Sequence, residues 1–200
     1  MPGSYKVSLV VDGAVVDTKP LTLVMDPQVL LTGVARTQYN ALVTDLHALH
    51  KKGADVGAQV TALNAELQKV AAKVDSSSAP DSVKKKFAAL RKEFDAVRPK
   101  FGVGLPAVGF GPAAAGAATA SANANVLGRL ATVKGAIMGA WERPSASLMK
   151  QATELKTQMP TAITSANAVL ARARALSQQL APFGVTVTVP SAATSAPATK

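Results

Sequence analysis

A regular run of apolar residues between positions 42 and 74 constrains the fold of this chain more than any other feature. Successive members lie alternately four and three residues apart without a break, and nine of the ten are apolar side chains. The members of this seam are Leu42, Leu46, Leu49, Gly53, Val56, Val60, Leu63, Leu67, Val70 and Val74. This heptad spacing predicts one helix over residues 34–74, about 60 Å long at about 1.5 Å per residue.

Two glycines are the weak points of this first predicted helix. Gly53 lies in the seam and Gly57 follows it by one turn. Each glycine lowers helix stability by up to about 1 kcal/mol relative to alanine. Because a glycine has no side chain, both positions also permit the close approach of a neighbouring helix.

A second helix is predicted after the Asp75–Pro80 break, because the same spacing returns. Its seam is Val83, Phe87, Leu90, Phe94 and Val97. Asp81 or Ser78 is the expected N-terminal cap, since their side-chain oxygens accept hydrogen bonds from the first turn. Pro99 is expected to end the helix near residue 98, because proline removes a backbone donor and clashes with the preceding turn.

Two further helices are predicted in the second half of the chain. The third has the seam Val126, Leu130, Val133 and Ile137, and is expected to end near Trp141, which would pack at the following turn. The fourth begins at Pro144–Ser145, and Pro160 is expected to kink it. Its seam is Leu148, Ala152, Leu155, Met159, Ala162, Ala166, Val169, Ala173, Leu176 and Leu180.

The helix lengths predict a mainly α fold, an elongated antiparallel helical bundle over residues 28–184. The first and fourth helices are about 35–40 residues long, and the second and third, about 19 each, together match one long helix. A Gly/Ala/Pro-rich loop at residues 102–123 would then break the middle rod, and a four-helix bundle with unequal helices is the alternative. Residues 185–200 are expected to hold a short strand-like segment, 185–189, and a disordered tail.

Before the helices, residues 4–25 have the pattern of a β-hairpin. Tyr5, Val7, Leu9 and Val11 alternate with polar residues, and Leu21, Leu23 and Met25 alternate again. Asp12-Gly13 predicts a type I′ turn, and Pro20, which cannot donate to a ladder, indicates an edge strand or a bulge. A lone hairpin is only marginally stable in water. Residues 1–27 are therefore predicted to be the last strands of an immunoglobulin-like sandwich, whose apolar face finds cover on the helices or stays exposed.

Composition and charge narrow the classes of function. The chain of 200 residues has a formal net charge of +10 and no cysteine, which excludes disulfides and thiolate metal sites. The second helix is strongly basic, but it has no recognised nucleic-acid motif, so a solvated basic face is favoured over nucleic-acid binding. Neither a signal peptide nor a transmembrane segment is predicted, because the chain opens with strand alternation and no apolar run reaches about 18 residues. The basic residues are Lys84, Lys85, Lys86, Arg91, Lys92, Arg98 and Lys100.

No residue of this chain is predicted to be catalytic, to bind a cofactor or to ligate a metal. His47 and His50 are three residues apart and could share a metal, but Asp45 is the only nearby acid, so two exposed histidines are the favoured interpretation. Glycoside hydrolysis needs two carboxyl groups about 5–10 Å apart across a cleft. The acids are instead scattered over Asp12, Asp26, Asp45, Asp55, Glu66, Glu93, Asp95 and Glu154. The glycines of 102–111 lack the strand and the Gly-Lys-Ser/Thr of a phosphate-binding loop.

The order of these segments resembles a known family. The stretch from Pro2 to Gly13, followed by Leu21 to Pro27, resembles the end of an immunoglobulin-like domain, with Tyr5 where a tyrosine corner would open the penultimate strand. Together with the long helices, the Pro144–Ser145 start and the ending Leu180–Val185, it resembles the C-terminal region of large bacterial exoproteins. Those proteins carry BNR/Asp-box β-propellers of the sortilin (VPS10) type and are often labelled glycosyl hydrolases.

The resemblance implies a non-catalytic C-terminal structural or interaction module of a larger secreted protein. Its implied partners are the propeller and sandwich domains of its own parent, with helix-mediated self-association as a further expectation, and its implied location is extracellular or periplasmic. No Ser-x-Asp-x-Gly-x-Thr-Trp box occurs here, so no catalytic position is carried over. Two alternatives remain, a glycosyl hydrolase as the family label has it, and a basic helical protein that binds nucleic acid or anionic surfaces.

Overall fold

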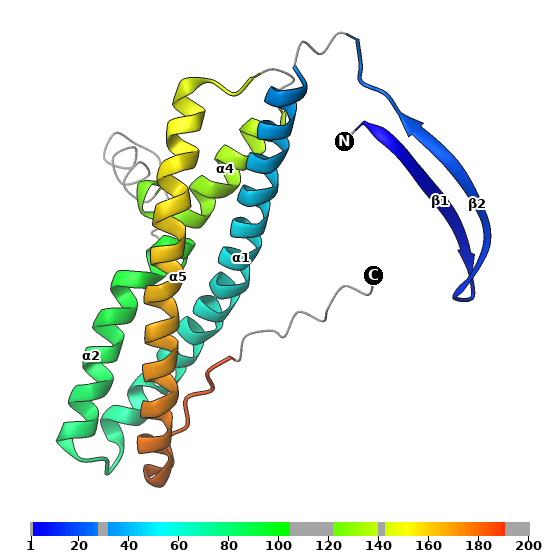
Figure 1. Cartoon of the computed structure of the whole chain (residues 1–200). Coiled ribbons are helices and arrows are strands. Elements are labelled where there is room, and N and C mark those ends of the chain that lie inside the picture. Colours follow the sequence, from blue (N-terminus) through cyan, green and yellow to red (C-terminus); the bar gives the residue numbers. More distant parts are fainter. Residues whose placement is uncertain (1, 28–31, 105–121, 140–142, 191–200) are drawn as a thin grey trace, which may run out of the picture.

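The chain folds into a mainly helical structure with an antiparallel β-hairpin at its N-terminal end, as the sequence predicts (Figure 1). The computed structural model describes residues 2–27, 32–104, 122–139 and 143–190. Its strands are β1 (Gly3–Val11) and β2 (Ala14–Leu23). Its helices are α1 (Gly33–Ser76), α2 (Asp81–Val97), α4 (Val126–Gly139) and α5 (Ala146–Leu180), with short 3₁₀ helices η1 (Arg98–Phe101) and η2 (Ala181–Phe183).

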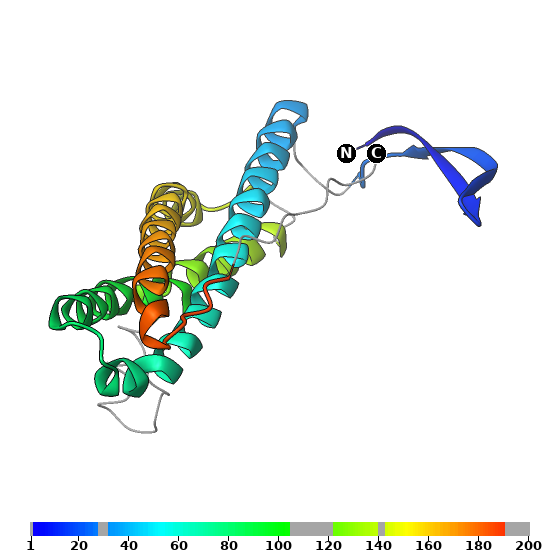
Figure 2. The same ribbon diagram turned by 90° about the horizontal axis from the view of Figure 1, so that it is seen from below.

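The described helices form three rods: α1 is the first, α2 and α4 together make the interrupted second, and α5 is the third. The long helices α1 and α5 run in the same direction and pack along each other, while α2 and α4 run the opposite way (Figures 1 and 2). Lys86 of α2 reaches Gln179 near the end of α5, whereas Arg129 of α4 reaches Gln158 in its first half. Helices α2 and α4 therefore cover successive stretches of α5, as expected for a middle rod that is broken in two.

The predicted seams are the core of this bundle. Leu46, Leu63 and Val74 of α1 are completely buried, as are Leu130 and Ile137 of α4 and Leu155, Met159 and Leu180 of α5. From α2, the core takes Phe87, Leu90, Phe94 and Val97. Only the outer seam positions Leu42, Leu49, Val83 and Leu148 are partly exposed. The heptad spacing thus identified which face of each helix is removed from water.

Two glycines of α1 allow α4 to approach closely, as predicted. A Cβ atom on Gly53 would lie 3.0 Å from Leu127 Cδ1 and 3.0 Å from Met159 Cε. A Cβ atom on Gly57 would lie 3.2 Å from the other methyl group of Leu127. The side chain of Leu127 therefore fills the space above α1 that these two glycines leave open.

Side-chain caps fix the starts of the two long helices, and one capping prediction is wrong. Thr32 Oγ1 accepts the N–H of Ala35 at 3.2 Å, and Ser145 Oγ accepts the N–H of Leu148 at 3.3 Å, which confirms the predicted start of α5. The N-cap of α2 is Pro80, without a side-chain bond, rather than Asp81 or Ser78. Asp81 already lies in the first turn, where its negative charge interacts favourably with the positive end of the helix dipole and stabilises the helix.

Prolines lie at the C-terminal end of α2 and inside α5. Helix α2 stops at Val97, and the 3₁₀ helix that follows it contains Pro99, close to the predicted end. Pro160 lies inside α5 on its exposed side, and the helix runs on to Leu180. An exposed position suits proline in a helix, because water can bond the carbonyl group that its missing N–H leaves free.

The segment after η2 is not a strand of a sheet, although its side chains alternate. Val185 and Val187 are each 3% exposed and belong to the bundle core. Ser177 Oγ accepts the N–H of Val187 at 3.0 Å and donates to its carbonyl at 2.9 Å. Glu66 of α1 accepts the N–H of Thr188 at 3.3 Å. The extended segment, residues 184–190, thus crosses α5 and α1 as a strap, and its two-residue period supplies alternate side chains to the core.

Three predictions fall on residues outside the described ranges. They are the packing of Trp141, the greater part of the loop at 102–123, and the disordered tail at 191–200. They remain predictions.

Candidate interaction surface

The hairpin turn has the geometry that its sequence predicts. Asp12 and Gly13 both have positive φ, 50° and 82°, as the two central residues of a type I′ turn require. The strands are paired from Val11↔Ala14 to Gly3↔Leu23. One irregularity interrupts the register, because Leu9 pairs with Asp17 while Val10 pairs with Val15. Val16 is therefore an extra residue in β2, a β-bulge beside the turn.

The register gives the hairpin one apolar face and one polar face. Cross-strand partners lie on the same face, so the alternation of β1 sorts the residues of both strands. The apolar face carries Tyr5, Val7, Leu9, Val11, Leu21 and Leu23, together with the Lys19–Asp17 ion pair at 3.8 Å. The other face is mainly polar and carries Ser4, Lys6, Ser8, Thr18, Pro20 and Thr22, with the apolar pair Val10↔Val15 next to the turn.

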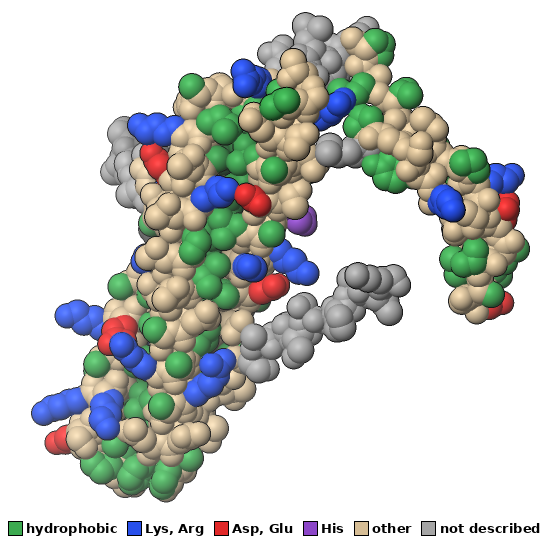
Figure 3. Space-filling model, in the orientation of Figure 1, with side chains coloured by type: hydrophobic (Ala, Val, Ile, Leu, Met, Phe, Trp, Pro, Cys, Tyr) green, Lys and Arg blue, Asp and Glu red, His purple; other side chains and the backbone are tan. Residues whose placement is uncertain are grey.

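The apolar face is exposed rather than covered by the helices. Its six apolar side chains are between 42% and 58% exposed, and every residue of both strands is solvent-exposed. The space-filling view shows hydrophobic side chains along the hairpin, outside the helical bundle (Figure 3). Of the two outcomes that the sequence left open for this face, exposure is the one observed.

Three of the acidic residues that could suggest catalysis are paired with cations. Asp45 of α1 binds Lys156 of α5 at 2.8 Å, and Glu93 of α2 binds Arg172 of α5. Asp95 and Arg98 form a pair within one turn, at 2.8 Å. Glu93 and Asp95 each line a surface hollow in which they are the single acid among the described lining residues.

His50 lies beside a lysine, and among the described residues neither histidine belongs to a cluster of metal-ligating side chains. His50 Nδ1 lies 3.3 Å from Lys134 Nζ, and within the described residues no group of three or more His, Asp or Glu side chains is placed to hold a metal. The pKa of His50 is lowered, first by burial and then by the positive charges of Lys134 and His47. The ammonium group of Lys134 beside this imidazole disfavours a second cation there.

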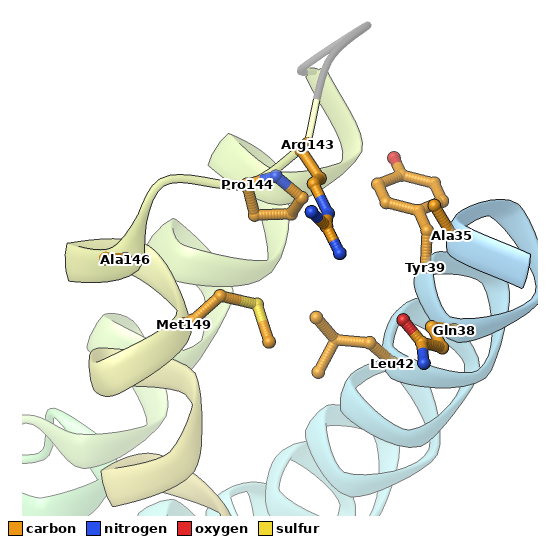
Figure 4. A pocket seen from close by; sticks show the side chains of 8 residues that line it. All are labelled: Ala35, Gln38, Tyr39, Leu42, Arg143, Pro144, Ala146 and Met149. Atoms are coloured by element: carbon orange, nitrogen blue, oxygen red, sulfur yellow. The ribbon is translucent and has the colours of Figure 1, made fainter. Parts of the chain in front are cut away.

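A shallow cleft of about 350 Å³ lies at the end of the bundle where α1 and α5 begin (Figure 4). Its walls are mainly apolar, and Leu42 and Met149 point toward its centre with Arg143 above them. Tyr39 Oη donates to the carbonyl of Ile137 at 2.9 Å, so this hydroxyl joins α1 to α4. With one guanidinium and one engaged phenol, the cleft offers no acid–base pair. The sequence did not indicate it, because its lining residues come from distant segments.

The basic residues of α2 lie on its solvated side. Lys84 donates to the carbonyl of Asp75 at 2.9 Å, and Lys86 donates to Gln179 Oε1 at 3.0 Å. Phe87 and Phe94 are both 3% exposed. Buried aromatic rings cannot stack on nucleic-acid bases, so the aromatic contribution to single-strand binding is missing from this helix.

Comparisons with protein-family models, with curated proteins and with solved structures found no match to this chain. The resemblance to the propeller exoproteins therefore stays a hypothesis. Among the helices of the described ranges, none combines the length and the apolar content that crossing a membrane requires.

Proposed function

We propose that this chain is a non-catalytic structural and interaction module of a larger secreted β-propeller protein. In this proposal the hairpin completes a β-sandwich of the parent, and the helical bundle is a spacer that carries or separates domains. The observation that supports it is the contrast between a closed helical core and a hairpin with one exposed apolar face.

The exposed face argues for an attachment role. Burial of apolar surface is worth roughly 25 cal/mol per Å², and a two-stranded hairpin alone is marginally stable. The bundle does not supply this burial, because the strands are exposed on both faces. A second sheet that packs on Val7, Leu9 and Leu21 would supply it, as the opposite sheet of a sandwich does.

The shape of the bundle suits a spacer. Helix α1 has 44 residues, so it is about 66 Å long at about 1.5 Å per residue. The core of the bundle is formed from apolar side chains of α1, α2, α4 and α5 and of the strap. The paired carboxylates support the non-catalytic part of the proposal.

The reading frame upstream of the first codon tests the parent protein. The proposal expects continuous coding for the remaining sandwich strands and, before them, for a β-propeller with Asp boxes. An in-frame stop codon next to an unrelated gene would contradict it.

The non-catalytic part is tested with the purified chain and a panel of chromogenic glycosides. No turnover above the uncatalysed rate is expected. Turnover that is lost in Asp45→Asn or Glu93→Gln, but kept in the exposed control Asp55→Asn, would instead support a hydrolase.

A further inference from the structure

The two outer edges of the hairpin differ, and this difference indicates where a partner strand is added. The inference rests on the proposed function, in which the hairpin completes a sheet. It identifies the strand of the hairpin that pairs with the next strand of that sheet. The two edges differ in the outward groups that the pairing register leaves, in one proline and in one side-chain hydrogen bond.

The register shows which backbone groups point outward. In an antiparallel ladder, pairs that exchange two N–H···O bonds alternate with pairs whose N–H and C=O groups point to the outer edges. Pro20 has no N–H, so its pair with Lys6 belongs to the outward kind. The pairs two residues away, Ser4↔Thr22 and Ser8↔Thr18, then belong to the same kind. The contact of 2.8 Å between Ser8 Oγ and Thr18 Oγ1 agrees, because side chains lie closer in such pairs.

The outer edge of β2 is obstructed at two of the three outward positions that face Ser4, Lys6 and Ser8. Pro20 has no donor, and the N–H of Thr18 is already bound to Asp17 Oδ1 at 2.7 Å, whereas Thr22, next to the end of the strand, has neither obstacle. The bulge at Val16 distorts the same strand toward the turn. Prolines, bulges and occupied donors are the means by which proteins protect sheet edges against further pairing.

The outer edge of β1 has none of these protections. Its outward residues Ser4, Lys6 and Ser8 are all able to donate, and within the described ranges no contact from outside the hairpin engages their backbone N–H groups. The strand is regular from Gly3 to Leu9. The structure assigns the outer edge of β1 as the site at which a strand of a β-sandwich sheet is added, by main-chain pairing with Ser4, Lys6 and Ser8.

The area of the hairpin indicates that the partner is a strand of a larger sheet rather than a second hairpin. Nine residues at about 3.3 Å each, and two strands about 4.8 Å apart, give a face of about 300 Å². A stable interface buries about 800 Å² per partner. Two copies stacked by their apolar faces fall short of this area. A sandwich supplies the missing area, because one sheet extends β1 while the other covers Val7 and Leu9.

The test places the same strand next to either edge of the full chain. An alternating Thr-Val strand is joined by an Asn-Gly turn before Gly3, where it can pair with β1, or after Val24, where it can pair with β2. Amide hydrogen exchange of the added strand is measured by NMR. We expect exchange about tenfold slower, or more, in the β1-side protein and no protection in the β2-side protein.

A pair of substitutions gives the matched control. Ser8→Pro and Thr18→Pro remove the same side-chain contact and change two outward positions of one cross-strand pair. Ser8→Pro should abolish the protection of the β1-side strand, and Thr18→Pro should leave it within about twofold. The inward amides of Tyr5 and Val7 report whether the hairpin itself persists. If Ser8→Pro loses the hairpin, the comparison of the two added strands decides the question alone.

The outcomes separate this inference from the proposed function. Protection on the β2 side only would overturn the edge assignment and leave the attachment role standing. Protection on neither side would contradict the attachment role itself. Sedimentation of the unmodified chain completes the test, because a dimer that Ser8→Pro dissociates would make a second copy the partner and overturn the sandwich assignment.

Discussion

The hairpin and the bundle each have a regular pattern of apolar residues, but only the pattern of the bundle is buried. In the bundle, residues spaced by four and three meet the seams of other helices, and most of them are buried. In the hairpin, residues spaced by two gather on one face that stays 42–58% exposed. A pattern therefore predicts which residues need cover, while the number of elements decides whether the chain supplies that cover itself.

The same substitution in the two regions should give the largest contrast. Leu63 is completely buried and Leu9 is 58% exposed. Leu63→Asp should lower the free energy of unfolding by about 3–5 kcal/mol, because it buries an unpaired charge. Leu9→Asp should leave helical melting, followed by circular dichroism, unchanged. Equal losses in both variants would mean that the hairpin packs on the bundle in solution.

A smaller effect is expected from a substitution at the close contact between α1 and α4. Gly53→Leu should destabilise the chain by about 1–3 kcal/mol, since the side chain would displace Leu127 and Met159. The matched control is Gly135→Ala in α4, where an added Cβ meets nothing within 4 Å. That variant should gain up to about 1 kcal/mol from helix propensity alone. Urea unfolding measures both, and a stabilising Gly53→Leu would contradict the packing described.

The strap can be tested by comparing neighbouring residues of opposite exposure. Val187→Ala should reduce stability by about 1–2 kcal/mol, because it empties space in the core. Thr186→Ala changes an exposed side chain and should stay within about 0.5 kcal/mol of the parent. Thermal melting of the two variants distinguishes a docked strap from a loose tail, for which both changes would be equally silent.

The smallest expected effect is on how the stability of the folded chain falls at acid pH. The pKa of Glu66 lies below its ordinary value, first because the carboxylate accepts the N–H of Thr188 and then through the charge of Lys69. A lowered pKa in the folded state adds stability above the ordinary pKa, and this stability is lost as the pH falls through the folded value. Glu66→Gln should therefore flatten the loss of stability between about pH 5 and pH 3. An unchanged slope would show that the strap contact does not persist in solution.

The sequence predicted the bundle better than its terminal details, for physical reasons. Seam positions such as Leu46 and Leu155 repeat over many turns, so the signal accumulates along the helix. The N-cap of α2 depends on a single residue, and Pro80 takes the place expected for Asp81 or Ser78. The alternation at Val185 and Val187 was recognised, but alternation alone does not distinguish a paired strand from a strap in a helical groove.

The interaction surface was predicted in part. The apolar face of β1 and the type I′ turn follow directly from alternation and from Asp12-Gly13. The difference between the two edges was not predicted, because it depends on the pairing register and on the bond from Thr18 to Asp17. Pro20 was the available signal, since a proline in a strand indicates an edge position or a bulge.

Amide hydrogen exchange of the unmodified chain tests most directly whether the hairpin and the bundle are separate in energy. We expect amides of α1 and α5 beside Leu63 and Leu155 to exchange only through global unfolding. Amides of β1 and β2 should exchange through local opening, with protection that Leu63→Asp does not change. Hairpin amides that share the protection of the bundle, and lose it in Leu63→Asp, would show that the two regions unfold as one unit.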